Sequence, residues 1–208
     1  MVLRSEDAER LSACLQGGGV VVFPTDTIYG LGCDPEDETA VRRLYELKGR
    51  PADRPAAVMF FDRERATAAL PELGDLERQA IAALLPGPLT LLLPNRKRRF
   101  PLACGPAPGA RSSLGLRVPL LSDALAALAS VPGPVMQSSA NLSGGAEARR
   151  LSDVPVSVRE GADLLIDGGE LPGVASTVLD LHDYERTDSW SILREGAMAR
   201  EAIERALR

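Results

Sequence analysis

The sequence predicts an α/β fold, a twisted sheet of mixed parallel and antiparallel strands with flanking helices. Strand-like apolar runs alternate with segments of helical spacing along the 208 residues. Several of the runs are apolar throughout, which is typical of strands covered on both faces. The last four follow one another with little helix between them, so part of the sheet is expected to be antiparallel. Without an internal repeat or a linker, a single domain over residues 1–208 is expected.

The first 49 residues predict two helices and one buried strand. Ser5 is a suitable N-cap for a helix that Gly17 ends. The run "VVVF" then predicts a buried strand. A second helix is expected over residues 37–48, with three apolar side chains on one face, and Gly49 ends it.

The rest of the chain continues this alternation. Short apolar runs bounded by proline, glycine or polar residues predict strands, and longer runs with a three- to four-residue spacing predict helices. The strands are expected at residues 56–61, 89–94, 114–119, 134–137, 163–167, 176–181 and 189–195, and the helices at 73–85, 122–129 and 198–207.

Composition excludes several classes of function. The net charge of −5 disfavours nonspecific binding of nucleic acid by the whole surface. Three cysteines, far apart and without a CxxC pair, argue against a disulfide framework or a zinc site, and the single histidine, His182, argues against a histidine-based metal site. No apolar run approaches the roughly 20 residues of a membrane span, and the N-terminus lacks the pattern of a signal peptide, so a cytoplasmic protein is expected.

Four clusters combine polar side chains with strand or helix ends, where α/β proteins bind ligands. The first, "FPTDTIYGLG" at residues 23–32, carries hydroxyls and glycines after a buried strand and predicts a pocket wall. The others are "KGRPADRP" at 48–55, "GLRVP" at 115–119 with "SSANLSG" at 138–144, and the segment from "STV" to "LREG" at 176–196.

Two of these clusters can be interpreted either as structural features without a ligand or as parts of a binding site. Lys48 and Arg50 could interact with the dipole at a helix C-terminus in solvent, or they could bind phosphates. Pro51 favours an extended backbone at Arg50, so interaction with the helix dipole explains Arg50 less well than Lys48. The composition of "SSANLSG" is that of a capped loop, although its place after a buried strand favours contact with a nucleotide.

Familiar catalytic patterns are missing from the sequence. It contains neither GxxxxGK[ST] nor GxGxxG, so the common phosphate-binding loops are excluded. Asp26 is the only carboxylate in its cluster, and one histidine cannot readily support a nucleophilic triad. Catalysis is therefore expected to depend on positioning and electrostatics, without a covalent nucleophile.

The clusters, in this order, resemble the YrdC/Sua5 family of threonylcarbamoyl-AMP synthases. The resemblance rests on "FPTDTIYGLG", "KGRP", "PGPLT", "LRVP", "SSANLSG" and "STV…LREG", and it covers residues 8–196. It implies a sheet around a deep, basic, concave cavity. It also implies synthesis of threonylcarbamoyl-AMP from L-threonine, bicarbonate or CO2, and ATP with its Mg²⁺, releasing pyrophosphate. A separate complex would then transfer the threonylcarbamoyl group to the adenosine beside the tRNA anticodon.

The resemblance also implies roles for individual residues. It implies a catalytic tetrad, an ATP site that includes the tetrad, and a threonine site, while Met59 and Gln137 depart from the residues common in the family. The tetrad is Lys48, Arg50, Ser139 and Asn141; the further ATP contacts are Arg54, Ser113 and Arg194; and the threonine contacts are Thr25, Thr27, Met59, Arg117, Gln137 and Ser176.

Two alternatives stay open at this stage. One is a non-catalytic RNA-binding protein similar to YciO, with "NRKRR" at residues 95–99 as its basic patch. YciO-type members tend to lack "KGRP" and the "SAN" motif, which are both present here. The other is a carbamoyl-adenylate-forming enzyme similar to a domain of hydrogenase maturation proteins. Direct contact with tRNA, weak if it occurs, is also left open.

Overall fold

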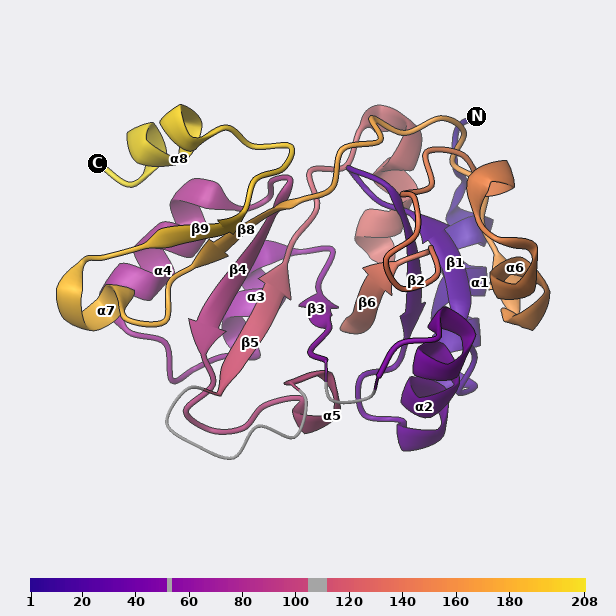
Figure 1. Cartoon of the computed structure of the whole chain (residues 1–208), viewed down its shortest axis with the longest axis horizontal. Helices are drawn as coiled ribbons and strands as arrows, with labels where there is room; N and C mark the ends of the chain where they lie inside the picture. The colour runs from indigo at the N-terminus through magenta and orange to yellow at the C-terminus, as the bar shows by residue number, and fades with distance from the viewer. Residues whose placement is uncertain (52–53, 105–111) are drawn as a thin grey trace.

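Among the residues that the structure describes, a single nine-stranded mixed sheet forms the framework (Figure 1). The computed structural model describes residues 1–51, 54–104 and 112–208. The strand order is β7-β1-β2-β6-β3-β5-β4-β8-β9. The strands are β1 (Val21–Pro24), β2 (Tyr29–Cys33), β3 (Ala57–Met59), β4 (Leu89–Pro94), β5 (Ser113–Arg117), β6 (Val135–Ser139), β7 (Leu164–Leu165), β8 (Thr177–Asp180) and β9 (Ser191–Arg194).

This sheet contains both parallel and antiparallel pairs. β7 is parallel to β1, β3 to β5, and β4 to β8. The other five neighbouring pairs are antiparallel. The predicted mixed sheet is therefore confirmed, and so is the expected antiparallel part, because β8 and β9 pair antiparallel.

Helices lie on both sides of the sheet and at its ends. In Figure 1, α1, α2 and α6 lie at the end of the sheet that contains β1 and β2. The helices α3, α4, α7 and α8 lie at the end that contains β4, β8 and β9. The helical elements are α1 (Ser5–Gln16), α2 (Glu38–Lys48), α3 (Arg63–Ala68), α4 (Asp75–Leu84), α5 (Pro101–Cys104), η1 (Asp123–Ser130), η2 (Leu151–Asp153), α6 (Val156–Gly161), α7 (Tyr184–Thr187) and α8 (Arg200–Ala206). None of the described helices has both the length and the apolar character needed to cross a membrane.

A tight turn at residues 25–28 joins β1 to β2. The Thr25 hydroxyl donates to the carbonyl of Ile28 at 2.7 Å and accepts from the backbone N–H groups of Thr27 and Ile28. The glycines that follow let β6 approach β2 closely: a Cβ on Gly32 would lie 2.7 Å from a methyl carbon of Val135. Packing and turn formation thus explain much of the unusual composition of "FPTDTIYGLG".

The end of α2 determines where Lys48 and Arg50 point. Asp37 caps the helix by accepting from the backbone N–H groups of Thr39 and Ala40. Gly49 ends it with φ of 57°, a left-handed conformation that favours glycine. This reversal leaves Lys48 buried under the loop after β6 and turns Arg50 toward the centre of the sheet.

Strand alternation makes one face of the central strands core and the other face the floor of a cavity. On β4, Leu89, Leu91 and Leu93 are fully buried in the core. Thr90 and Leu92, between them, line the cavity. β5 repeats the pattern, with Leu114 and Leu116 in the core and Ser113, Gly115 and Arg117 lining the cavity. Because successive side chains of a strand point to opposite faces, the same two strands supply both core residues and the floor of the cavity.

Most predicted elements are present, with differences of a few residues at their ends. Three differences concern the nature of an element or its cap. Ser5 is the first residue of α1, and Arg4 occupies the N-cap position. Half of the 23–32 stretch is strand β2, whose glycines hid its strand character. The short helices α3 and α6 were not expected, because six residues are too few to show helical periodicity.

Candidate active site

The candidate site is a cavity of about 350 Å³ over the central strands. This volume lies in the range of small-molecule sites. Its lining combines small apolar groups, hydroxyls and three guanidinium groups. The described lining residues are Ile28, Arg50, Pro55, Ala56, Ala57, Thr90, Leu92, Ser113, Gly115, Arg117, Gln137, Ser138, Ser139, Glu147, Ala175, Ser176, Val178 and Arg194.

Arg50 is held at one side of the cavity by two neutral oxygen acceptors. Its Nη1 donates to the Ser138 hydroxyl at 3.3 Å and its Nη2 to the carbonyl of Pro55 at 2.5 Å. Its Nε is buried without a partner among the described residues. Burial lowers the pKa of Arg50 below its usual value, although the group stays charged at neutral pH. Since neither of these contacts with described residues is to a carboxylate, the guanidinium can still bind an anion.

Lys48 lies beneath the loop after β6 and is only 2% exposed. Its ammonium donates to the carbonyl and hydroxyl of Ser139 at 2.5 and 3.1 Å, and to the backbone and side-chain oxygens of Asn141 at 2.9 and 2.7 Å. Burial, together with the charge of Arg50, lowers its pKa to about 8. Lys48 therefore holds the shape of the loop from inside, and the lining residues that the structure describes do not include it.

Arg117 forms the floor of the cavity in a cluster of buried polar groups. Its Nη2 donates to Asp26 Oδ1 at 2.8 Å and to the Thr27 hydroxyl at 3.2 Å, and its Nη1 donates to Gln137 Oε1 at 3.1 Å. The second carboxylate oxygen of Asp26 accepts from the backbone N–H of Leu120. Burial raises the pKa of Asp26 and lowers that of Arg117, and their mutual attraction opposes both shifts. Asp26 thus fixes the guanidinium in one orientation.

The far side of the cavity is built from β8, β9 and β4. Arg194 donates to the carbonyl of Ser176 at 2.8 Å and to its hydroxyl at 3.2 Å. The same hydroxyl lies 2.9 Å from that of Thr90. On β5, the Ser113 hydroxyl lies 3.1 Å from Nδ1 of His182. Hydroxyls and guanidinium groups thus line one space, which suits a ligand with several negative charges and hydrogen-bonding groups.

Sequence comparison matches residues 13–196 to the Sua5/YciO/YrdC family, described as "Telomere recombination". This chain belongs to the Sua5/YciO/YrdC family. Proteins named threonylcarbamoyl-AMP synthase are 32% identical to it in Pyrococcus abyssi, 36% in Chromohalobacter salexigens and 35% in Bacillus subtilis. The matches cover 93%, 86% and 93% of this chain, respectively.

Solved structures show the same family fold. The chain superposes on Pyrococcus abyssi Sua5 complexed with L-threonine with a TM-score of 0.83 and 31% identity, over 99% of this chain and 58% of Sua5. It superposes on E. coli YciO with a TM-score of 0.77 and 26% identity, over 96% of this chain and 94% of YciO. The chain spans about half the length of the Pyrococcus and Bacillus relatives, and the match covers 97% of the Chromohalobacter relative.

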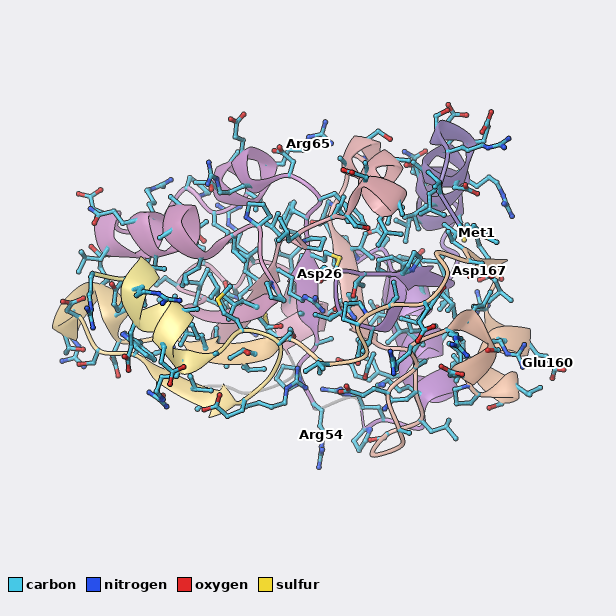
Figure 2. The ribbon with its side chains drawn as sticks, turned by 90° about the horizontal axis from the view of Figure 1, so that it is seen from above. Met1, Asp26, Arg54, Arg65, Glu160 and Asp167 are labelled. Atoms are coloured by element: carbon cyan, nitrogen blue, oxygen red, sulfur yellow. The ribbon has the colours of Figure 1, made fainter. Side chains whose placement is uncertain are left out.

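The residues predicted from the family resemblance fall into two groups in the structure. One group lines the cavity: Arg50, Ser113, Arg117, Gln137, Ser139, Ser176 and Arg194. The other is absent from the described lining: Thr25, Thr27, Lys48, Met59 and Asn141 are buried, and Arg54 is exposed. Figure 2 shows the Arg54 side chain pointing away from the ribbon, on the opposite side of the sheet from Arg65 of α3.

For the buried residues, the structure indicates indirect contributions. Thr27 supports Arg117, and Asn141 links Lys48 to the carbonyl of Gly145. Met59 is fully buried in the core. Direct contact of any of these residues with a substrate stays a prediction.

Several residues that line the cavity were not predicted from the sequence. Thr90 carried a usable signal, because it is the one polar residue within the apolar run "LTLLLP" and a polar residue there indicates a strand face turned toward a cavity. Ser138 adjoins a predicted contact. Glu147 gave no signal, since it lies in a polar loop beyond the motif.

The basic run at residues 95–99 is largely engaged within the fold. Arg96 forms a bidentate pair with the fully buried carboxylate of Glu77 at 2.8 and 3.0 Å. Arg99 pairs with Glu72 at 3.3 Å. Two of the four cations of "NRKRR" therefore stabilise the structure, which weakens the case for an RNA-binding patch in this Sua5/YciO/YrdC protein.

Proposed function

We propose that this chain is an enzyme that synthesises threonylcarbamoyl-AMP from L-threonine, bicarbonate or CO2, and ATP, with release of pyrophosphate. In reaction class it is a nucleotidyltransferase. The observation that carries the proposal is the convergence of Arg50, Arg117 and Arg194 with the hydroxyls of Ser113 and Ser176 on one cavity. The names of its relatives, and a similar Sua5 structure that contains L-threonine, support the choice of substrates.

The geometry supports two separate binding regions in the cavity, one for threonine and one for the ATP phosphates. Arg117 lies where it could bind the carboxylate of threonine, oriented by Asp26. Arg50, Ser139 and Arg194 lie where they could bind the phosphates, with Ser113 as a further contact for ATP. Because Arg194 bonds to Ser176, the proposed phosphate and threonine regions meet at that serine.

Catalysis in this proposal is electrostatic. An oxygen of N-carboxythreonine attacks the α-phosphate, pyrophosphate leaves, and negative charge on the phosphate oxygens is met by fixed guanidinium groups. Mg²⁺ would enter on the ATP phosphates as part of the substrate. Among the described residues, no group of three or more His, Cys, Asp or Glu side chains could hold a metal ion.

The product would have a role in tRNA modification. We place the protein in the cytoplasm, where a separate transferase complex would take the threonylcarbamoyl group to the adenosine beside the anticodon. A direct contact with tRNA is not needed for the first step. Salt-dependent binding of tRNA would reveal such a contact, because binding through phosphates weakens steeply with added salt.

The proposal predicts that pyrophosphate release depends on both L-threonine and bicarbonate. In the proposed reaction N-carboxythreonine is the nucleophile, so ATP should stay intact until it forms. The measurement is a coupled pyrophosphate assay with each substrate omitted in turn. Release at an unchanged rate without any amino acid would contradict the proposed reaction.

A further inference from the structure

Glu147 is a carboxylate in a cavity whose other described lining residues are cations and neutral groups. Among the described lining residues it is the only acidic side chain, against three arginines. Its one recorded hydrogen bond is accepted from the backbone N–H of Ala175 at 3.1 Å. Of the ion pairs recorded between described residues, none includes Glu147, whereas Asp26 is already paired with Arg117. Within the described lining, Glu147 is therefore the carboxylate that could still pair with a positively charged group of a substrate.

The backbone on both sides of Glu147 is anchored. Two residues before it, the carbonyl of Gly145 accepts from Asn141 Nδ2 at 2.6 Å, and Asn141 is itself held by Lys48. One residue after it, the carbonyl of Ala148 accepts from the backbone N–H of Tyr29 at 3.0 Å. The carboxylate is thus presented by a supported loop, although the residue is exposed.

The hydrogen bond to Ala175 places the carboxylate next to the proposed amino-acid region. Ala175 immediately precedes Ser176, whose hydroxyl contacts both Thr90 and Arg194. A free amino acid at neutral pH carries an ammonium as well as a carboxylate. Arginines alone would attract the carboxylate and repel the ammonium, so a selective amino-acid site also needs a negative group.

We propose that Glu147 binds the α-ammonium group of the amino-acid substrate, a role that rests on the proposed function. Arg117 and Glu147 together would then recognise the two charges of a zwitterion. In this arrangement Glu147 is a specificity-determining residue for amino acids, and it distinguishes them from hydroxy acids of the same shape that lack the amine.

The test compares Glu147→Gln with the wild-type protein by calorimetric titration of three ligands, L-threonine, 3-hydroxybutanoate and Mg·ATP. Glutamine keeps the acceptor for the Ala175 N–H and removes only the charge. Because the residue is exposed, we expect about a fivefold weaker affinity for L-threonine, the scale of a partly solvated ion pair. The affinity for 3-hydroxybutanoate, which is threonine without its amine, should not change. Glu170→Gln is the matched control, since Glu170 is an exposed carboxylate paired with Arg149 and Arg150.

The outcomes separate this inference from the function on which it rests. Equal loss of affinity for both ligands, or none for threonine, would overturn the ammonium assignment. A selective loss of affinity for Mg·ATP would also overturn it, by assigning Glu147 to the metal-nucleotide complex. If the wild-type protein bound no threonine at all, the proposed function itself would fail, and the assignment would fail with it.

Discussion

Arg50→Ala is expected to lower turnover by about 10²–10³, the usual loss when one preorganised donor to developing charge is removed. Arg50 lines the cavity and is oriented by Ser138 and Pro55 through neutral oxygens, so its charge is available to a substrate anion. In the proposed reaction negative charge builds on the oxygens of the α-phosphate. A guanidinium can meet two such oxygens at once.

The measurement for Arg50 is steady-state turnover, with far-UV circular dichroism and melting temperature as checks on folding. Arg50→Lys should recover only part of the activity, because an ammonium supplies a point charge in place of a planar fork. Arg42→Ala is the matched control, since Arg42 is exposed on α2, the helix that precedes Arg50 in the chain. Full activity of Arg50→Ala, or equal losses in the two alanine variants, would refute the phosphate-binding role.

Lys48→Met is expected to lower both activity and stability. Methionine fills much of the same space but leaves the buried oxygens of Ser139 and Asn141 without their donor. Each buried acceptor that loses its partner costs about 1–3 kcal/mol unless it finds another. Displacement of the loop by even about 1 Å would lower turnover by about 10². Arg50→Ala, by contrast, should lose activity while keeping its melting temperature.

Lys97→Met is the matched control for Lys48, because Lys97 is exposed and is the only other lysine. If Lys48→Met kept the wild-type melting temperature and lost only affinity for ATP, Lys48 would be a phosphate ligand instead of an internal support for the loop.

The pH dependence of ATP binding provides a second test of this role. The pKa of Lys48 is about 8 in the folded protein, against 10.5 for an ordinary lysine. Between these values the unfolded chain keeps the proton that the folded protein has lost, so this ionisation does not destabilise the fold as the pH rises. It does remove the ammonium that holds the loop. ATP affinity, measured without threonine, should therefore fall above about pH 8, and constant affinity from pH 7 to about 9.5 would contradict the account.

The fold was largely predictable from local pattern. Apolar runs such as "LTLLLP" predict buried strands because their leucines leave no solvent-facing side, and capping residues such as Asp37 mark helix ends. β2 was missed because glycines at positions 30 and 32, which permit close packing against β6, remove the usual strand signal. Pairing order depends on contacts between distant segments, which no local pattern contains.

The site was predictable only in part, and for physical reasons. Arg50 and Arg117 stand at element ends, where a motif indicates a pocket. Whether Lys48 faces the solvent, the ligand or the interior depends on where the loop after β6 folds back, and the structure places its ammonium inside. The support of Arg117 by Asp26 and the position of Glu147 depend likewise on tertiary approach.

The most direct test of the central claim is to look for the product itself. The purified protein is incubated with Mg·ATP, bicarbonate and isotopically labelled L-threonine, and the mixture is resolved by chromatography and mass spectrometry. The account predicts a new species that contains the threonine label, a carbonyl group from bicarbonate and AMP, formed in step with pyrophosphate. Consumption of ATP without any species joining threonine to AMP, or no reaction with all three substrates present, would contradict it.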